Sequence, residues 1–325
     1  MPTEELVKIL SDGCIHSGEA LGASLGVSRV AVWKRLKKLD DIGIEVETIK
    51  GKGYRLGSPL DLLDGPTIRS HFDVRCDHCI SAIEIFFQIE STNTWLLERS
   101  RDSGINGVVC LAEQQVAGRG RRGREWVSPF GRNIYMSIGW EFAQGAAVLE
   151  GLSLAVGVAM VRALSSVGVQ QLALKWPNDL ISSGKKLAGI LLEMSGDASG
   201  SCSVVIGIGL NVDMQPADAN KIDQPWTDVA SVLGSTVSRN LLIGRILKEL
   251  IPILGGYQEV GFSHYQAEWN QCDYLLGQPV ELNGMREAIS GVARGVDASG
   301  ALIVDTESGA KYIKGGEVSV RKVST

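Results

Sequence analysis

The segment GRGRRGREW (residues 118–126) places four arginines among three glycines in a chain whose formal net charge is −5. Guanidinium groups bind phosphates and carboxylates, and glycine allows the backbone to come close to a ligand. The order of residues in a Walker A loop, G-x-x-x-x-G-K-[ST], is absent. The composition indicates a loop that surrounds a small anion, although a disordered basic loop would have a similar composition.

Four other short segments carry polar groups at the ends of predicted strands. They are Glu90–Asn93, Lys175–Asp179, Lys185–Gly189 and Gly207–Asn211. Each has a plain structural interpretation when taken alone: a helix N-cap, a turn, a strand start and a strand end. Their order along the chain, together with the arginine-rich segment, favours one ligand site.

None of the four histidines (His16, His71, His78 and His264) lies in these segments, so we predict that they are ordinary surface or core residues. Cys76-Asp77-His78-Cys79 has a spacing that could share a zinc ion, but the other four cysteines form no second pair. The sequence therefore favours a reduced loop at this segment and predicts no metal site of protein ligands.

A second basic segment lies near the N-terminus, where residues 28–39 contain five cations and no acid. Helices are predicted at Thr3–Leu10, at Ser17–Leu25 and after Ser28, and the last of these has Val32, Leu36 and Leu39 on one stripe. A strand at Ile44–Ile49, a Gly-rich turn and Tyr54–Leu56 would complete a winged helix-turn-helix. A protein-docking module with a basic face is the alternative.

In a winged helix-turn-helix the third helix enters the major groove and the wing meets phosphates. We therefore expect DNA contacts from the start and outer face of that helix and from the wing. The residues predicted to contact DNA are Ser28, Arg29, Trp33, Lys34, Lys37, Lys52 and Arg55.

The patterning predicts three domains, with residues 1–60 forming the winged helix-turn-helix, 65–272 a mixed α/β domain and 273–325 a small β-barrel. The predicted central strands are Ala82–Ile89, Val108–Glu113, Asn133–Trp140, Leu172–Lys175, Lys186–Glu193 and Ser203–Leu210. The predicted central helices are Asn93–Arg99, Leu149–Val167 and Arg239–Tyr257. Closely spaced turn signals at Asn283-Gly284, Asp297–Gly300 and Glu307–Gly309 indicate the β-barrel.

The composition, with 44% apolar and 21% charged residues, is that of a globular protein. No apolar run approaches the length of a membrane helix, and the acidic N-terminus does not resemble a secretion signal. We therefore expect a cytoplasmic protein with no membrane partner. The acidic balance also argues against a protein coated in nucleic acid, so the two basic segments need separate explanations.

Taken together, Glu90–Asn93, Gln115–Arg124, Ser128–Gly131, Lys175–Asp179, Lys186–Ile190 and Gly209–Asn211 resemble the biotin–protein ligases. Ser17–Glu19 and Gly51–Tyr54 resemble the bifunctional members, which also repress biotin-synthesis genes. The resemblance covers essentially the whole chain. It implies a multidomain α+β fold with a winged helix-turn-helix, a ligase domain of the biotin/lipoate type and an SH3-like C-terminal barrel.

The resemblance implies that biotin and ATP, with Mg²⁺, give biotinyl-5′-adenylate, from which biotin passes to a lysine of the biotin carboxyl carrier protein. The residues it implies for biotin are Ser91, Thr92, Asn93, Gln115, Arg119, Gly120, Arg121, Lys186 and Gly189. Those it implies for ATP are Arg121, Arg124, Lys175, Asn178, Asn211 and Trp226. Lys186, Arg121, Arg119 and Asp179 are the expected catalytic residues, and Trp226 has a packing role as its alternative.

Two positions depart from the usual family pattern: Glu90 replaces an aspartate, and Val116 replaces a polar residue. The large Trp33 on the third helix leaves the operator sequence open. Because a DNA-binding unit and a ligand-binding loop occur in one chain, we also hypothesise that the bound adenylate orders residues 118–124 and promotes a homodimer, which binds operator DNA as a repressor. The alternatives are a lipoate–protein ligase and a biotin-sensing transcription factor without ligase activity.

Overall fold

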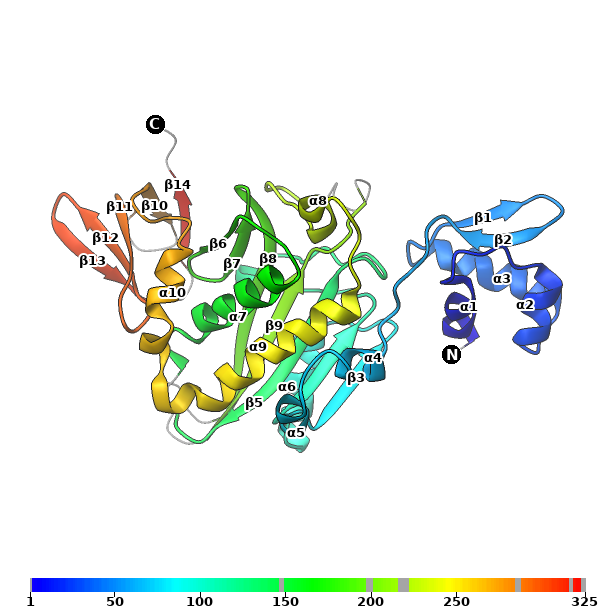
Figure 1. Ribbon diagram of the computed structural model, residues 1–325, viewed down its shortest axis with the longest axis horizontal. Coiled ribbons are helices and arrows are strands. Elements are labelled where there is room, and N and C mark those ends of the chain that lie inside the picture. Colours follow the sequence, from blue (N-terminus) through cyan, green and yellow to red (C-terminus); the bar gives the residue numbers. More distant parts are fainter. Residues whose placement is uncertain are drawn as a thin grey trace.

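The computed structural model describes residues 2–145, 149–196, 201–215, 222–283, 288–315 and 318–322. Figure 1 shows three successive units: a small helical unit with a hairpin, a large central sheet with long helices, and a set of short strands next to the C-terminus. None of the described helices is long and apolar enough to cross a membrane.

The N-terminal unit has three helices and one hairpin, which confirms the predicted winged helix-turn-helix. The elements are α1 (Pro2–Leu10), α2 (Gly18–Ser24), α3 (Arg29–Asp40), β1 (Val46–Ile49) and β2 (Gly53–Leu56). Ser17 and Ser28 cap α2 and α3 by accepting from the backbone N–H groups of Ala20 at 3.0 Å and Ala31 at 3.3 Å. These caps fix where the two helices of the DNA-binding motif begin.

The central unit contains a seven-stranded sheet in the order β3-β4-β5-β9-β8-β7-β6. Its strands are β3 (Ala82–Phe86), β4 (Val108–Ala112), β5 (Ile134–Phe142), β6 (Leu172–Lys175), β7 (Asp179–Ser182), β8 (Lys185–Gly196) and β9 (Cys202–Leu210). The β3–β4 pair is parallel, and all the other described pairs are antiparallel. The predicted central domain of mixed helices and strands is confirmed.

The helices around the sheet are α4 (Gly65–Arg69), α5 (Val74–Cys79), α6 (Thr92–Asp102), α7 (Leu152–Ser166), α8 (Val229–Leu233), α9 (Arg239–Val260) and α10 (Gln266–Gln271). The long helices α7 and α9 share one buried cluster with one face of the sheet, whereas α6 packs against the other face. Alternation along β9 assigns the faces, because Ile206 and Ile208 lie in the α7/α9 core while Val205 packs with α6. The odd-numbered positions of β9 therefore face α6 and Trp126.

A buried ion pair fixes the segment that connects the first two units. Arg239, at the start of α9, donates to Glu113 at 2.7 Å, and their side chains are only 3% and 5% exposed. Arg239 also donates to the backbone carbonyls of Asp61 and Asn133, while Glu113 accepts from the Leu63 amide at 2.7 Å. These contacts hold the connecting segment at Asp61–Leu63 against the residue that follows β4 and against the start of α9.

The C-terminal unit is an all-antiparallel sheet in the order β13-β12-β11-β10-β14. Its strands are β10 (Pro279–Asn283), β11 (Ile289–Val296), β12 (Leu302–Thr306), β13 (Gly309–Ile313) and β14 (Ser319–Lys322). Asp297 forms the predicted turn by accepting from the backbone of Ser299 at 2.8 Å and Ala301 at 3.0 Å. The predicted Asn283-Gly284 turn falls partly outside the described residues.

Several predicted boundaries were wrong. The strand predicted to reach Ile89 ends at Phe86, and the helix predicted at Leu149–Val167 begins at Leu152. The segment Cys76–Cys79, predicted as a loop, belongs to α5, which Asp73 caps through the Cys76 amide. Among the described residues, no three His, Cys, Asp or Glu side chains gather as a metal site.

Asp273 is a partly buried carboxyl at the junction between α10 and the C-terminal sheet. One of its oxygens accepts from the Leu275 amide at 2.8 Å, and the other is buried without a hydrogen-bond partner among the described residues. Burial raises the pKa of this carboxyl to about 6. Because the folded state then binds more protons than the unfolded state between pH 4 and 6, stability falls as pH rises through that window.

We therefore expect Asp273→Asn to stabilise the protein above pH 6 by about 2 kcal/mol and to have little effect near pH 4. Urea unfolding at pH 4.5 and 7.5 measures the difference. Asp305→Asn, which changes a half-exposed carboxylate paired with Arg294, is the matched control. Equal stabilisation by Asp273→Asn at both pH values would contradict the assignment.

Candidate active site and nucleic-acid interface

A cavity of about 650 Å³ lies between the central sheet, the arginine-rich segment and strand β14. It brings together most of the side chains predicted from separate segments of the sequence. The predicted residues that line it are Ser91, Thr92, Asn93, Gln115, Arg119, Gly120, Arg121, Arg124, Lys175, Asn178, Asp179, Lys186 and Gly189. Segments spread over about 100 positions of the chain therefore form one site.

Glycines on the paired strands β8 and β9 make room for this cavity. Gly189 pairs with Gly209, and the indole of Trp126 lies directly against both positions. A side chain at Gly207 would collide with the amide of Asn93. The alternation that predicts a strand thus also places three glycines on one face, where they let Asn93 and Trp126 approach the backbone.

The floor of the cavity is a buried hydrogen-bond chain of hydroxyl and amide groups. Ser137, fully buried on β5, lies 2.5 Å from the Asn93 carbonyl oxygen and 2.6 Å from the Thr92 hydroxyl. Gln115 Oε1 accepts from the Thr92 amide at 2.9 Å, and Gln115 Nε2 donates to Ser128 at 3.5 Å. Ser137 was not predicted, although a lone serine in an otherwise apolar strand is a signal for it.

Arg121, in the short 3₁₀ turn Arg121–Gly123, reaches into the cavity. It donates to Asn178 Oδ1 at 3.1 Å and to the backbone carbonyl of Val318 at 3.4 Å. Asn178 is itself held by its amide, which donates to the Ile190 carbonyl at 2.8 Å. Burial lowers the pKa of Arg121, because the charged guanidinium loses water. The nearby charge of Asp179 partly offsets this effect, and an anionic ligand would offset it further.

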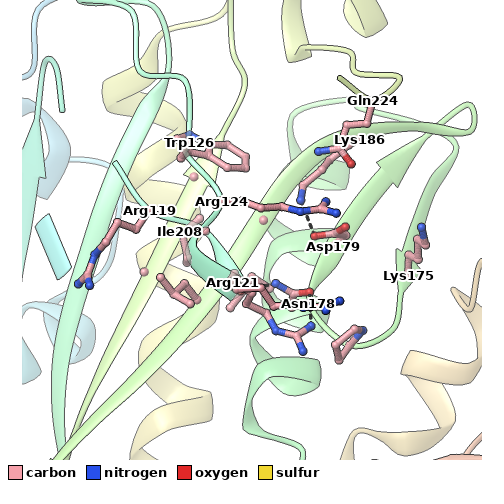
Figure 2. Close-up of a pocket in the computed structure, with 18 of the residues that line it drawn as sticks. Arg119, Arg121, Arg124, Trp126, Lys175, Asn178, Asp179, Lys186, Ile208 and Gln224 are labelled. Atoms are coloured by element: carbon pink, nitrogen blue, oxygen red, sulfur yellow. Dashed lines mark hydrogen bonds and ion pairs between the residues drawn. The ribbon is translucent and has the colours of Figure 1, made fainter. Parts of the chain in front are cut away.

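Lys186 and Asp179 form the central ion pair of the site. Lys186 Nζ lies 2.7 Å from Asp179 Oδ1, and the two side chains are 17% and 20% exposed. The ammonium also lies 5.6 Å from the centre of the Trp126 ring. Figure 2 shows Lys186, Arg124 and Arg121 reaching toward Asp179 and Asn178. A bound anion would meet an ammonium and two guanidinium groups from different elements.

Lys175 lies at the C-terminal end of β6 in a crowded group of cations. Burial is the largest cause of its lowered pKa, and Lys186, Arg321 and Lys322 add repulsion that Asp179 partly offsets. Arg321 and Lys322, from the C-terminal strand β14, also line the cavity and were not predicted. Such an excess of positive charge suits a phosphate chain.

Arg119 differs from the other arginines of its segment. Its guanidinium donates to Thr94 at 3.0 Å and pairs with Glu193 at 3.3 Å, and it points away from Arg121 and Arg124 (Figure 2). Arg119 and Arg121 both line the cavity, but their guanidinium groups lie in different parts of it. The cause is Glu193, a carboxylate on β8 that the sequence analysis did not select.

The predicted nucleotide residues Asn211 and Trp226 lie in an adjoining cavity of about 210 Å³. Pro225, which precedes Trp226, accepts a hydrogen bond from the Lys186 amide at 2.9 Å. This contact holds Trp226 beside the start of β8. Asn211 donates to the Thr227 carbonyl at 3.0 Å. Trp126, Arg124 and Lys186 line both cavities, so the two spaces meet along these side chains.

Most of the predicted DNA-contacting residues are exposed on the N-terminal unit. Trp33 on α3 is 46% exposed, and Lys37 Nζ lies 4.3 Å from the centre of its ring. Ser28, Arg29, Lys34 and Lys52 are also exposed. Arg55 instead pairs with Glu47 across the wing at 2.7 Å, so a phosphate would have to compete with that carboxylate.

The fold and site are those of the biotin/lipoate ligase class: residues 85–211 match the Biotin/lipoate A/B protein ligase family. Residues 275–321 match the Biotin protein ligase C terminal domain, and residues 3–55 match an HTH domain. A structure of the biotin protein ligase from Aquifex aeolicus in complex with biotin and ATP is 28% identical, with a TM-score of 0.65. It covers 75% of this chain and 100% of its own.

Two curated relatives are similar over nearly their whole length. The bifunctional ligase/repressor BirA of Salmonella typhimurium is 40% identical over 97% of this chain and 96% of its own. That of Escherichia coli is 38% identical over 98% of this chain and 96% of its own. The chain belongs to the family of bifunctional biotin ligase/repressors.

Proposed function

We propose that this chain joins biotin to ATP and then transfers biotin to a lysine of a biotin carboxyl carrier protein. A biotin carboxylate oxygen attacks the α-phosphorus, and pyrophosphate leaves. The carrier amine then attacks the acyl carbon of biotinyl-5′-adenylate, an amide bond forms, AMP leaves and the ammonium proton passes to solvent. All the reacting groups come from substrates, so the protein needs only to align them and to stabilise charge.

One observation supports this proposal most directly. Uncharged polar residues line one part of the cavity, and several cations line the opposite part. The lining residues Thr92, Asn93 and Gln115, with Ser137 hydrogen-bonded behind them, suit a ureido ring, which has N–H and C=O groups. The cationic part, centred on Lys186, suits a carboxylate and a phosphate chain. Lipoate, whose dithiolane ring has neither N–H nor C=O, would leave the buried floor without partners.

We assign roles by position in the cavity. Ser91, Thr92, Asn93, Gln115 and the Gly120 and Gly189 backbone border the biotin ring. Arg121, Arg124, Lys175, Asn178, Asn211 and Trp226 border the nucleotide, and Lys186, paired with Asp179, contacts the reacting carboxylate and α-phosphate. Arg119 would contact the biotin carboxylate only after its ion pair with Glu193 breaks.

Mg²⁺ would enter with ATP, because it is usually held by one or two carboxylates plus the substrate phosphates. The residues present fit this mode, since Asp179 and Asp223 both line the cavity. When bound, the ion supplies charge neutralisation of the phosphates. Asp179 would then be shared between the ion and Lys186.

We propose that residues 1–60 bind operator DNA and residues 65–272 carry the ligase site, in a cytoplasmic repressor of biotin-synthesis genes. Lys34→Ala should weaken operator binding several-fold and reduce its dependence on salt, because it removes one phosphate-binding cation. Biotin ligation should stay at the wild-type rate. Gel-shift titrations at two salt concentrations and a carrier-biotinylation assay measure the two activities.

Arg121→Ala is the matched variant for that experiment. It should slow adenylate formation strongly while leaving DNA binding without ligand unchanged. If Lys34→Ala and Arg121→Ala each lost both activities equally, this division of the chain would be wrong.

We further propose that biotinyl-5′-adenylate promotes a homodimer, which presents two α3 helices to a two-fold operator. The support is the combination of a DNA-binding unit and a ligand-binding segment in one chain. Sedimentation at micromolar protein should change from monomer to dimer when biotin and ATP are added. A monomer under both conditions would refute this step.

A further inference from the structure

Two large apolar side chains are exposed on helix α3 of the N-terminal unit. Val30 is 65% exposed and Trp33 is 46% exposed, so both meet water in the free protein. Residues three apart on a helix lie on the same face, and these two are therefore neighbours. The core of the unit does not use them, because a different stripe of the helix, Val32, Leu36 and Leu39, is buried there.

The same face of α3 carries cations. Lys34 and Lys37 follow Val30 at the i+4 and i+7 positions, which is the spacing of one helix face, and both are exposed. Lys37 Nζ lies 4.3 Å from the centre of the Trp33 ring, a contact that favours one orientation of the indole before any partner arrives. Residues 28–39 contain five cations and no acid, so this face complements a polyanion.

DNA offers few groups that match an apolar side chain. In the major groove the edges of the base pairs present hydrogen-bond donors and acceptors, and the methyl group among them is the C5-methyl of thymine. The first residues of a recognition helix are those that contact base edges. Because α3 begins at Arg29, Val30 and Trp33 lie in its first two turns, where bases are read.

We propose that Val30 and Trp33 read thymine through its C5-methyl group, so that a thymine opposite each side chain determines which operator this chain selects. The inference rests on the operator binding proposed above. Lys34 contributes charge next to these contacts and carries no sequence information, because phosphates are the same at every base pair.

The test uses duplexes that the wild-type chain selects from a random DNA pool in the presence of biotin and ATP. Each thymine of the selected half-site is then replaced in turn by uracil, which pairs in the same way and lacks only the C5-methyl group. Gel-shift titration should show two positions at which uracil weakens binding, by about fourfold for each contacted methyl. Val30→Ala should reduce the loss at one of these positions to less than about twofold, and Trp33→Ala should do so at the other.

Two further variants separate base reading from general weakening. Lys34→Ala should weaken binding to the thymine and uracil duplexes equally, because it removes a phosphate contact. Val74→Ala removes the same side-chain atoms from another helical valine, which is 69% exposed on α5 of the central unit, and it should change neither affinity. Thermal unfolding of each variant shows whether it folds.

Equal affinity of the wild-type chain for thymine and uracil at every position would overturn this inference while leaving operator binding intact. Losses on uracil substitution that persist in both Val30→Ala and Trp33→Ala would overturn it as well. Failure to select any duplex would instead contradict the proposed operator binding, indicate a protein partner for this face of α3, and overturn this inference with it.

Discussion

Lys186→Met should slow formation of the acyl-adenylate by about 10²- to 10³-fold, the usual effect of removing a preorganised charge that stabilises the transition state. The ammonium of Lys186 lies 2.7 Å from Asp179 and is mostly buried, so it is held in place before substrate arrives. Methionine keeps a similar unbranched stem but removes the charge. Biotin-dependent ATP–pyrophosphate exchange, measured at saturating substrates, reports the rate of this step.

The neighbouring residue provides a control. Lys185 precedes Lys186 on β8, is exposed and does not line the cavity. Lys185→Met should therefore retain the wild-type exchange rate within about twofold, a difference of less than 0.5 kcal/mol in activation free energy. Equal exchange rates in the Lys186→Met and wild-type chains would exclude a role for this ammonium in the reaction.

Arg239→Ala should lower the free energy of unfolding by about 3–5 kcal/mol, because it leaves the Glu113 carboxylate buried without its charged partner. Arg239 also donates to the carbonyls of Asp61 and Asn133, so the connector loses its anchor as well. Urea unfolding at pH 7.5 measures the change.

Removing both charges separates the ion pair from the packing. The double variant Arg239→Met with Glu113→Leu should recover a large part of the loss, since no isolated charge remains buried. Arg294→Ala, which breaks a half-exposed pair with Asp305, should cost at most about 1 kcal/mol. A loss of that small size for Arg239→Ala would show that Glu113 regains water in the folded state.

Local signals in the sequence predicted the fold well where they were sufficient on their own. Ser28 caps α3 as predicted, and the apolar positions Val32, Leu36 and Leu39 form the buried stripe of that helix. Short elements without such signals were missed. The strand β7 is an example, because its four residues acquire their hydrogen-bond partners only from β6 and β8.

The candidate site was predictable as a set of segments but not as a network. Thr92, Gln115 and Lys186 lie in recognisable motifs, and they do line one cavity. Glu193 and Ser137 stand among apolar strand residues, and their role depends on contacts with Asn93, 100 and 44 positions away. The position of Arg119 could not be predicted for the same reason, since it follows from the Glu193 contact.

The measurement that tests the central proposal most directly is ATP–pyrophosphate exchange by the purified chain with biotin, with lipoate and with neither. Exchange should require biotin, should be negligible with lipoate and should fall in Lys186→Met. Exchange supported equally by lipoate, or no exchange with biotin, would contradict a site in which a polar floor holds the biotin ring and converging cations hold its carboxylate and the α-phosphate.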